Sequence, residues 1–137
     1  MNYIEAKSLD SRLKRFEKPL VKTVTRVFDY LRLQDVQLEI YIINASKMRK
    51  LNLKYRGLDK PTDVLAVEQP DFPKVKNKVL GEIYLCPAQV KKKPYTLEYA
   101  LLHGVLHLLG FNHDVRSDKI KMEKEENKIL EWLDHTS

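Results

Sequence analysis

Three of the four histidines in this chain lie within eleven residues, in the segment HGVLHLLGFNH. The first two belong to a strongly apolar stretch, 97–109, in which Glu98 is the only acidic or basic residue apart from the histidines. This composition predicts a largely buried helix that begins after Thr96 and ends at Gly110. Because such a helix has almost no polar face, the rest of the chain has to pack around it.

The spacing of these histidines predicts a metal site. Four residues turn a helix through about 400°, so His103 and His107 project from the same face, one turn apart. Gly110 allows the backbone to reverse, which would bring His113 back to face the other two. Three neutral imidazoles and an open position are typical of a catalytic zinc ion. A lone helical histidine is usually exposed to solvent, or hydrogen-bonded in the core. Three histidines on the apolar side of one helix would lose their hydration with no favourable interaction in return unless they bind a partner such as a metal ion.

The same spacing, HxxxHxxGxxH, occurs in the metzincin proteases, whose catalytic glutamate directly follows the first histidine. In this chain the corresponding residue is Gly104. The predicted metal ligands are therefore retained, while the general base of peptide hydrolysis is missing. A peptidase or similar hydrolase is accordingly disfavoured.

Periodicity elsewhere predicts a mixture of helices and strands. Further helices are expected at 8–31, 47–55 and 117–133, strands at 2–6, 36–43, 63–67 and 79–85, a helical turn after Pro87, and a loop with two prolines at 68–78. Asn44 or Ser46 can cap the second helix and Gly57 can end it, while Pro19 could kink the first. Because the elements do not follow a regular βαβα order, we expect an α+β fold with helices packed on one small mixed sheet.

Length and composition limit the type of protein. The chain has 137 residues, which fits a single domain over 1–137. Cys86 is its only cysteine, which excludes an internal disulfide and a CxxC zinc ribbon, and we expect it to be a small core residue at a strand end. The N-terminus lacks a signal-peptide pattern and no apolar run approaches the ~20 residues that cross a bilayer. We therefore expect a cytoplasmic protein without a membrane partner.

The basic surplus is unevenly distributed along the chain. The net charge is +6, but the segment 114–137 holds seven acids and five bases, so 1–113 carries +8. Basic residues cluster at 47–60, 74–78 and 91–93. Such clusters can bind a polyanionic partner, because they release counterions on binding, but charge alone is more typical of a solvated surface.

A second group of polar residues surrounds Gly57 and Pro61, where we expect a loop. Arg56 at the start of this loop can donate two hydrogen bonds to a phosphate, or stabilise charge that develops in a transition state. The alternative is a salt bridge from Arg56 to Asp59 or Asp63 that anchors the loop. The sequence alone does not decide between these roles.

Three segments, LNLKYRGLDKPTDVLAV, LGEIYLCP and LLHGVLHLLGFNHD, resemble in this order the YbeY-type family of bacterial rRNA maturation endoribonucleases. The resemblance spans about residues 36–133. It implies a zincin-like α+β fold, a zinc ion held by His103, His107 and His113, and a functionally important arginine at Arg56. Nickel or another divalent ion is an alternative to zinc, since imidazole suits several of them.

The resemblance also implies a function. The family cleaves single-stranded RNA in 16S rRNA 3′-end maturation and in quality control of the small ribosomal subunit. Single-stranded RNA, rRNA and the small subunit with its proteins are therefore the expected partners, and DNA is not expected.

The chain departs from the family pattern at two places. The family usually reads Thr-Asp-Val-Leu-Ser-Phe where this chain has Ala66 and Val67, and Gly-Tyr-Asp-His where it has Phe111 and Asn112. If the missing aspartate orients a ligand imidazole, Asn112 would weaken metal binding by ~10–100-fold. These departures favour the alternative function, a non-catalytic ribosome assembly factor stabilised by zinc.

A mechanism follows from the expected residues. A histidine-bound zinc ion lowers the pKa of water and neutralises charge at phosphorus. We expect Arg56 to clamp the phosphate, and Lys54 and Lys60 to hold the flanking strand. The candidates for a general base, or for residues that support the ligands, are Asp63, Glu82 and Asp114. Attack by the 2′-hydroxyl of the RNA is also open.

Overall fold

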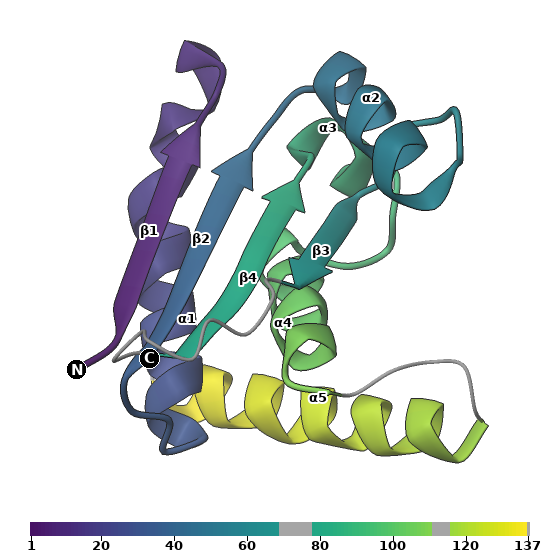
Figure 1. The fold of residues 1–137 in the computed structure, drawn as a ribbon. Coiled ribbons are helices and arrows are strands. Elements are labelled where there is room, and N and C mark those ends of the chain that lie inside the picture. The colour runs from purple at the N-terminus through teal and green to yellow at the C-terminus, as the bar shows by residue number, and fades with distance from the viewer. Residues whose placement is uncertain (69–77, 111–115, 137) are drawn as a thin grey trace.

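A four-stranded β-sheet lies at the centre of the described part of this computed structural model, which covers residues 1–68, 78–110 and 116–136 (Figure 1). In spatial order the strands are β1 (Tyr3–Ser8), β2 (Val36–Ile42), β4 (Lys78–Leu85) and β3 (Val64–Glu68). The first three run parallel, and β3 pairs antiparallel with β4 at one edge. The sheet is mixed, as predicted, and β1 forms the other edge. Residues 69–77 of the expected loop lie outside the described residues.

Alternating side chains divide the sheet into two faces. In β2, Ile40 is buried, while its neighbours Glu39 and Tyr41 lie on the opposite face. The register extends this division across the sheet, because Ile40 lies beside Ala6 of β1 and Ile83 of β4. One face is therefore apolar and requires a covering layer.

Two helices of the described residues cover this face, α1 (Glu17–Tyr30), which contacts β1, and α4 (Leu97–Leu108), which contacts β3 and β4 (Figure 1). A further helix, α5 (Arg116–Thr136), packs against α1 and α4 across one end of the sheet. Seven of the twelve residues of α4 are buried. Thr96 caps this helix by accepting a hydrogen bond from the Tyr99 amide at 3.1 Å. The prediction of a buried, Thr96-capped helix is confirmed.

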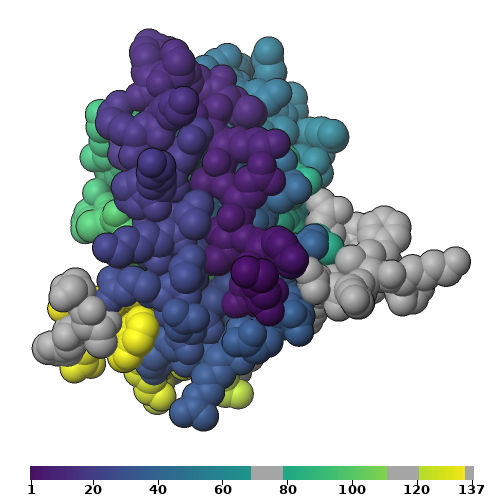
Figure 2. Space-filling view, turned by 90° about the vertical axis from the view of Figure 1, so that its left-hand side faces the viewer, coloured from purple at the N-terminus to yellow at the C-terminus, as the bar shows by residue number. Residues whose placement is uncertain are grey.

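The amphipathic segment after β1 forms two helices rather than one. Ser11–Phe16 is a 3₁₀ helix, η1, which Asp10 caps by accepting a backbone hydrogen bond, and α1 begins only at Glu17. The predicted continuous helix over 8–31 is therefore wrong before Glu17. Pro19 lies in the first turn of α1, where its missing N–H costs no intrahelical hydrogen bond, so it belongs to a helix start and not to a kink. Together β1, η1 and α1 form one outer face of the molecule (Figure 2).

Helix α2 (Ala45–Arg56) lies at the end of the sheet and covers part of its second face. Asn44 caps it by accepting a hydrogen bond from the Lys47 amide at 2.9 Å, and Gly57 ends it with a φ of 72°, both as predicted. A second small core lies beneath α2 and consists of Ile43, Met48, Leu65 and Cys86. Cys86 is fully buried, which confirms its predicted core position, and this burial raises the pKa of its thiol.

The short helix α3 (Pro87–Val90) follows β4 with its proline in the first turn, as expected, and leads toward α4. No helix within the described ranges is long and apolar enough to cross a membrane.

Candidate active site

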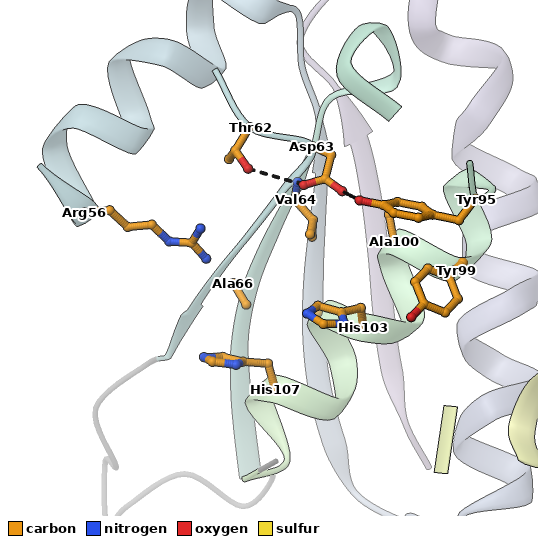
Figure 3. A pocket seen from close by; sticks show the side chains of 11 residues that line it. Arg56, Thr62, Asp63, Val64, Ala66, Tyr95, Tyr99, Ala100, His103 and His107 are labelled. Carbon is orange, nitrogen blue, oxygen red and sulfur yellow. Dashed lines mark hydrogen bonds between the residues drawn. The ribbon is translucent and has the colours of Figure 1, made fainter. Parts of the chain in front are cut away.

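A cavity of about 310 Å³ lies between β3 and α4 (Figure 3). Its lining residues come from the end of α2, the segment before β3, β3 itself, the segment before α4, and α4. They are Arg56, Thr62, Asp63, Val64, Ala66, Tyr95, Tyr99, Ala100, His103, Gly104 and His107. The fold thus brings together two of the three predicted metal ligands, the predicted arginine and one predicted base.

His103 and His107 lie on successive turns of α4 and face the same cavity (Figure 3). Both side chains are partly exposed, although α4 as a whole is buried. The predicted projection of these two histidines from one helix face is confirmed. His113 lies outside the described residues, as do Asn112 and Asp114.

Gly104 allows α4 to lie close to the sheet beside this cavity. A Cβ atom at this position would lie 3.2 Å from Val64 Cγ2 and 3.3 Å from Ile83 Cδ1. These distances are shorter than ordinary van der Waals contacts, so a larger residue would require the neighbours to move. At the position that holds the catalytic glutamate in metzincins, the close packing of α4 against β3 and β4 therefore leaves little room for a side chain in this protein.

Arg56 approaches the cavity from the side opposite the histidines (Figure 3). It is the last residue of α2, and the left-handed Gly57 ends the helix directly after it. Among the described residues, no carboxylate lies within ion-pair distance of Arg56. Asp59, one of its two expected partners, instead pairs with Arg49, whose Nε lies 2.7 Å from Asp59 Oδ1. This geometry favours the ligand-binding role of Arg56 over the loop-anchoring role.

Asp63 lines the cavity, but its carboxylate is engaged by the protein. Oδ1 accepts hydrogen bonds from the Val64 amide at 2.9 Å and from Thr62 Oγ1 at 3.3 Å. Oδ2 accepts a hydrogen bond from the Tyr95 hydroxyl. Burial and this hydrogen bond raise the pKa of Tyr95. These contacts identify Asp63 as an anchor between β3 and the segment before α4.

Glu82, another predicted base, does not line the cavity. It alternates with the buried Ile83 along β4, so its side chain lies on the sheet face away from α4. There it accepts a hydrogen bond from the Tyr84 hydroxyl. The expectation that Glu82 belongs to the site therefore fails for a geometric reason.

Lys54 and Lys60 are exposed and do not line the cavity either. The ammonium group of Lys54 lies 5.2 Å from the centroid of the Tyr55 ring. Both lysines lie within four residues of Arg56 in the sequence, Lys54 on α2 and Lys60 in the segment before β3.

Glu126 is a site residue that sequence reasoning did not select. It lies on α5 with only 1% of its surface exposed, and its Oε1 atom is 3.3 Å from Nδ1 of His103. The available signal was its position on the helix, because the buried residues of α5 include Met122, Glu126, Ile129 and Leu133, spaced by four, three and four. A carboxylate in such an apolar stripe indicates a specific partner.

Tyr99 completes the contacts behind the histidines. Burial, followed by the Glu126 carboxylate, raises the pKa of its hydroxyl. Its ring centroid lies 4.9 Å from that of Tyr95 and 6.4 Å from that of His103. The rings of Tyr95, Tyr99 and His103 therefore follow one another from the segment before α4 into the helix, and all three line the cavity.

The donor set fits a divalent metal ion only in part within the described residues. His103 and His107 supply two imidazoles toward one cavity, and the carboxylate of Glu126 lies beside Nδ1 of His103. In the ranges 1–68, 78–110 and 116–136, no group of three histidine, cysteine or carboxylate side chains is placed to hold a metal by itself. His113 is the predicted third ligand, and two ligands one turn apart are consistent with that set.

The fold and the cavity define an α+β protein with a histidine-bearing helix packed beneath an edge strand. The family model described as Endoribonuclease YbeY matches residues 3–134. The chain belongs to the YbeY family, which confirms the resemblance of its motifs.

Individual relatives and a solved structure agree with this assignment. Endoribonuclease YbeY from Buchnera aphidicola subsp. Schizaphis graminum is 36% identical over 106 residues, which cover 72% of this chain and 67% of that protein. Endoribonuclease YbeY from Thermodesulfovibrio yellowstonii is 32% identical over 142 residues, covering 95% and 89%. The solution structure of TM1509 from Thermotoga maritima matches 99% of this chain and 94% of that chain, with a TM-score of 0.55 and 26% identity.

Proposed function

We propose that this protein is a metal-dependent endoribonuclease that cleaves single-stranded RNA. The observation that carries the proposal is the position of His103 and His107 opposite Arg56 across one cavity, in a chain of the YbeY family. The relatives described above bear the name endoribonuclease, which supports RNA as the substrate class.

The imidazoles of His103, His107 and His113 would hold one divalent ion, with zinc as the first candidate and nickel as an alternative. When bound, such an ion lowers the pKa of water and neutralises negative charge on a phosphate oxygen. His103 and His107 provide two of these nitrogens from a rigid, buried helix, which limits their movement on binding.

Arg56 would bind the scissile phosphate or its neighbour. Its guanidinium group can donate two parallel hydrogen bonds to phosphate oxygens, and these strengthen as negative charge develops. Lys54 and Lys60 would attract the flanking RNA from outside the cavity, where a solvated ammonium group acts over several ångströms.

None of the described candidates is placed to act as a general base. Asp63 is engaged by three hydrogen bonds, Glu82 lies on the other sheet face, and Asp114 is not among the described residues. Two nucleophiles therefore remain, water and the 2′-hydroxyl of the RNA. Attack by the 2′-hydroxyl forms a 2′-O–P bond, breaks the P–O5′ bond and leaves a 2′,3′-cyclic phosphate, whereas attack by water leaves none.

We further propose rRNA as the natural substrate, in 16S rRNA 3′-end maturation and in quality control of the small ribosomal subunit. The family membership and the +8 charge of residues 1–113 support this role. It would place the protein in the cytoplasm with the small subunit as its partner. Ala66 favours a second candidate, a non-catalytic assembly factor, because the family hydroxyl missing at this position would lie in the cavity wall.

The deciding experiment measures RNA cleavage and bound metal on the same samples of wild type and His107→Ala. We expect cleavage of single-stranded RNA that requires one metal ion per chain, and loss of both in the variant. End-group analysis of the products identifies the nucleophile. Bound metal without cleavage in the wild type would overturn the nuclease proposal and favour the assembly-factor function.

A further inference from the structure

The buried carboxylate of Glu126 lies behind the histidine pair and not in the cavity wall. Its Oε1 atom is 3.3 Å from Nδ1 of His103, the ring nitrogen nearest the helix backbone. Moving a carboxylate from water into the core is unfavourable unless specific partners receive it. The structure supplies such a partner on α4, His103, although Glu126 itself belongs to α5.

Tyr99 lies one turn before His103 on the same helix, and its ring centroid is 6.4 Å from that of His103. Burial, followed by the Glu126 carboxylate, raises the pKa of its hydroxyl. The contact between Glu126 Oε1 and Nδ1 is the one that bears on the orientation of the His103 ring.

We infer that Glu126 is a positioning residue that holds His103 as its Nδ1–H tautomer, with Nε2 on the opposite side of the ring as the metal-binding nitrogen. An ionised carboxylate only accepts hydrogen bonds, so the nitrogen facing it carries the proton. Rotation of the ring by 180° would place a carbon atom against the carboxylate. Glu126 therefore determines both the tautomer and the ring orientation, and this inference rests on the proposed metal-binding function of His103.

Supporting contacts of this kind have a large effect on metal binding. A carboxylate that accepts the second N–H of a ligating histidine typically changes metal affinity by ~10–100-fold. The expected contribution of Glu126 is of this size, although its carboxylate is not expected to touch the ion.

The first test needs no metal. Long-range ¹H–¹⁵N spectra of metal-free protein distinguish the two neutral tautomers of His103. We expect the Nδ1–H form in wild type, the same form in Glu126→Gln, whose amide oxygen can still accept, and a mixture of forms in Glu126→Leu. An Nε2–H tautomer of His103 in the wild type would overturn the inference.

The second test is titration with Zn²⁺ against a competing chelator. We expect Glu126→Leu to bind Zn²⁺ ~10–100-fold more weakly than wild type, and Glu126→Gln to bind it more tightly than the leucine variant. Glu131→Leu, which replaces an exposed acid of the same helix, is the matched control and should bind like wild type. Wild-type affinity in a folded Glu126→Leu variant would refute the positioning role.

The two tests separate this inference from the proposed function. A wild type that binds no Zn²⁺, yet shows the Nδ1–H tautomer of His103, would support the orienting contact and overturn the metal-dependent function. If Glu126→Leu does not fold, the wild-type spectrum and the Glu126→Gln titration still decide the outcome.

Discussion

The Tyr95 hydroxyl donates a hydrogen bond to Asp63, and this contact ties the start of β3 to the segment that leads into α4. Arg56 reaches the cavity from the β3 side, whereas the histidines belong to α4. The distance across the cavity therefore depends on how these two segments are held together.

Removal of this hydrogen bond should reduce stability without removing a ligand. We expect Tyr95→Phe to lower the free energy of unfolding by about 1–2 kcal/mol, since the acceptor is a charged carboxylate. Urea titration measures this change. Tyr3→Phe removes an exposed hydroxyl and serves as the control. Equal free energies of unfolding for the two variants would show that the Tyr95–Asp63 hydrogen bond does not stabilise the fold.

Arg56→Ala should separate metal binding from turnover. We expect kcat for RNA cleavage to fall by about 10²–10³, the loss typical for one donor to a developing negative charge. Metal content should stay at the wild-type value, because Arg56 is not a ligand. Arg56→Lys should recover part of the rate, since it keeps the charge but not the paired hydrogen bonds.

The control for Arg56 is Lys22→Ala, which removes an exposed positive charge from α1. It should cleave RNA like wild type. Loss of metal in Arg56→Ala, in parallel with activity, would contradict the phosphate-binding role and indicate a structural one.

Gly104→Glu would restore the residue that metzincins carry, and we expect it to destabilise the protein without creating a protease. The new Cβ would lie within 3.3 Å of Val64 and Ile83, and a carboxylate would then be pressed against the sheet. The free energy of unfolding should fall by about 3 kcal/mol or more. Thermal unfolding tests the loss of stability and a casein assay tests for protease activity. Gly104→Ala, which adds only the Cβ atom, should destabilise the protein less. A stable variant that cleaves casein would contradict the packing argument.

Gly110 and Gly57 offer a paired test of the chain reversal predicted after α4. Both adopt positive φ, 107° and 72°, and neither would meet a neighbouring atom within 4 Å if it carried a Cβ. Alanine at either position should therefore cost about 1 kcal/mol of stability through backbone strain alone. Only Gly110→Ala should also weaken Zn²⁺ binding, because Gly110 lies between His107 and His113. Equal Zn²⁺ affinity of the two variants would argue against a role of this turn in ligand placement.

Local features of this chain could be predicted where short-range chemistry decides them. Asn44, Thr96 and Gly57 act at helix ends through contacts with residues a few positions away, so the residue type was sufficient. The division into η1 and α1 was not predictable from periodicity, because helices with 3.0 and 3.6 residues per turn place apolar side chains at similar spacings.

The site was predictable for residues that share one element and less so for residues joined by packing. His103 and His107 follow from the period of one helix. The contact of Glu126 with His103 depends instead on how α5 packs on α4, which no local pattern specifies. The wrong expectation for Glu82 could have been avoided, since strand alternation places it opposite Ile83.

The contact between α4 and α5 can form only after both helices have been synthesised. A chain synthesised only as far as α4 already contains Arg56 and both helical histidines, but α5 and its carboxylate do not yet exist. The parallel pairs β1–β2 and β2–β4 likewise join residues far apart in the chain, and such pairings form slowly. If Glu126 orients His103 as proposed, this orientation is absent from a nascent chain that ends before α5.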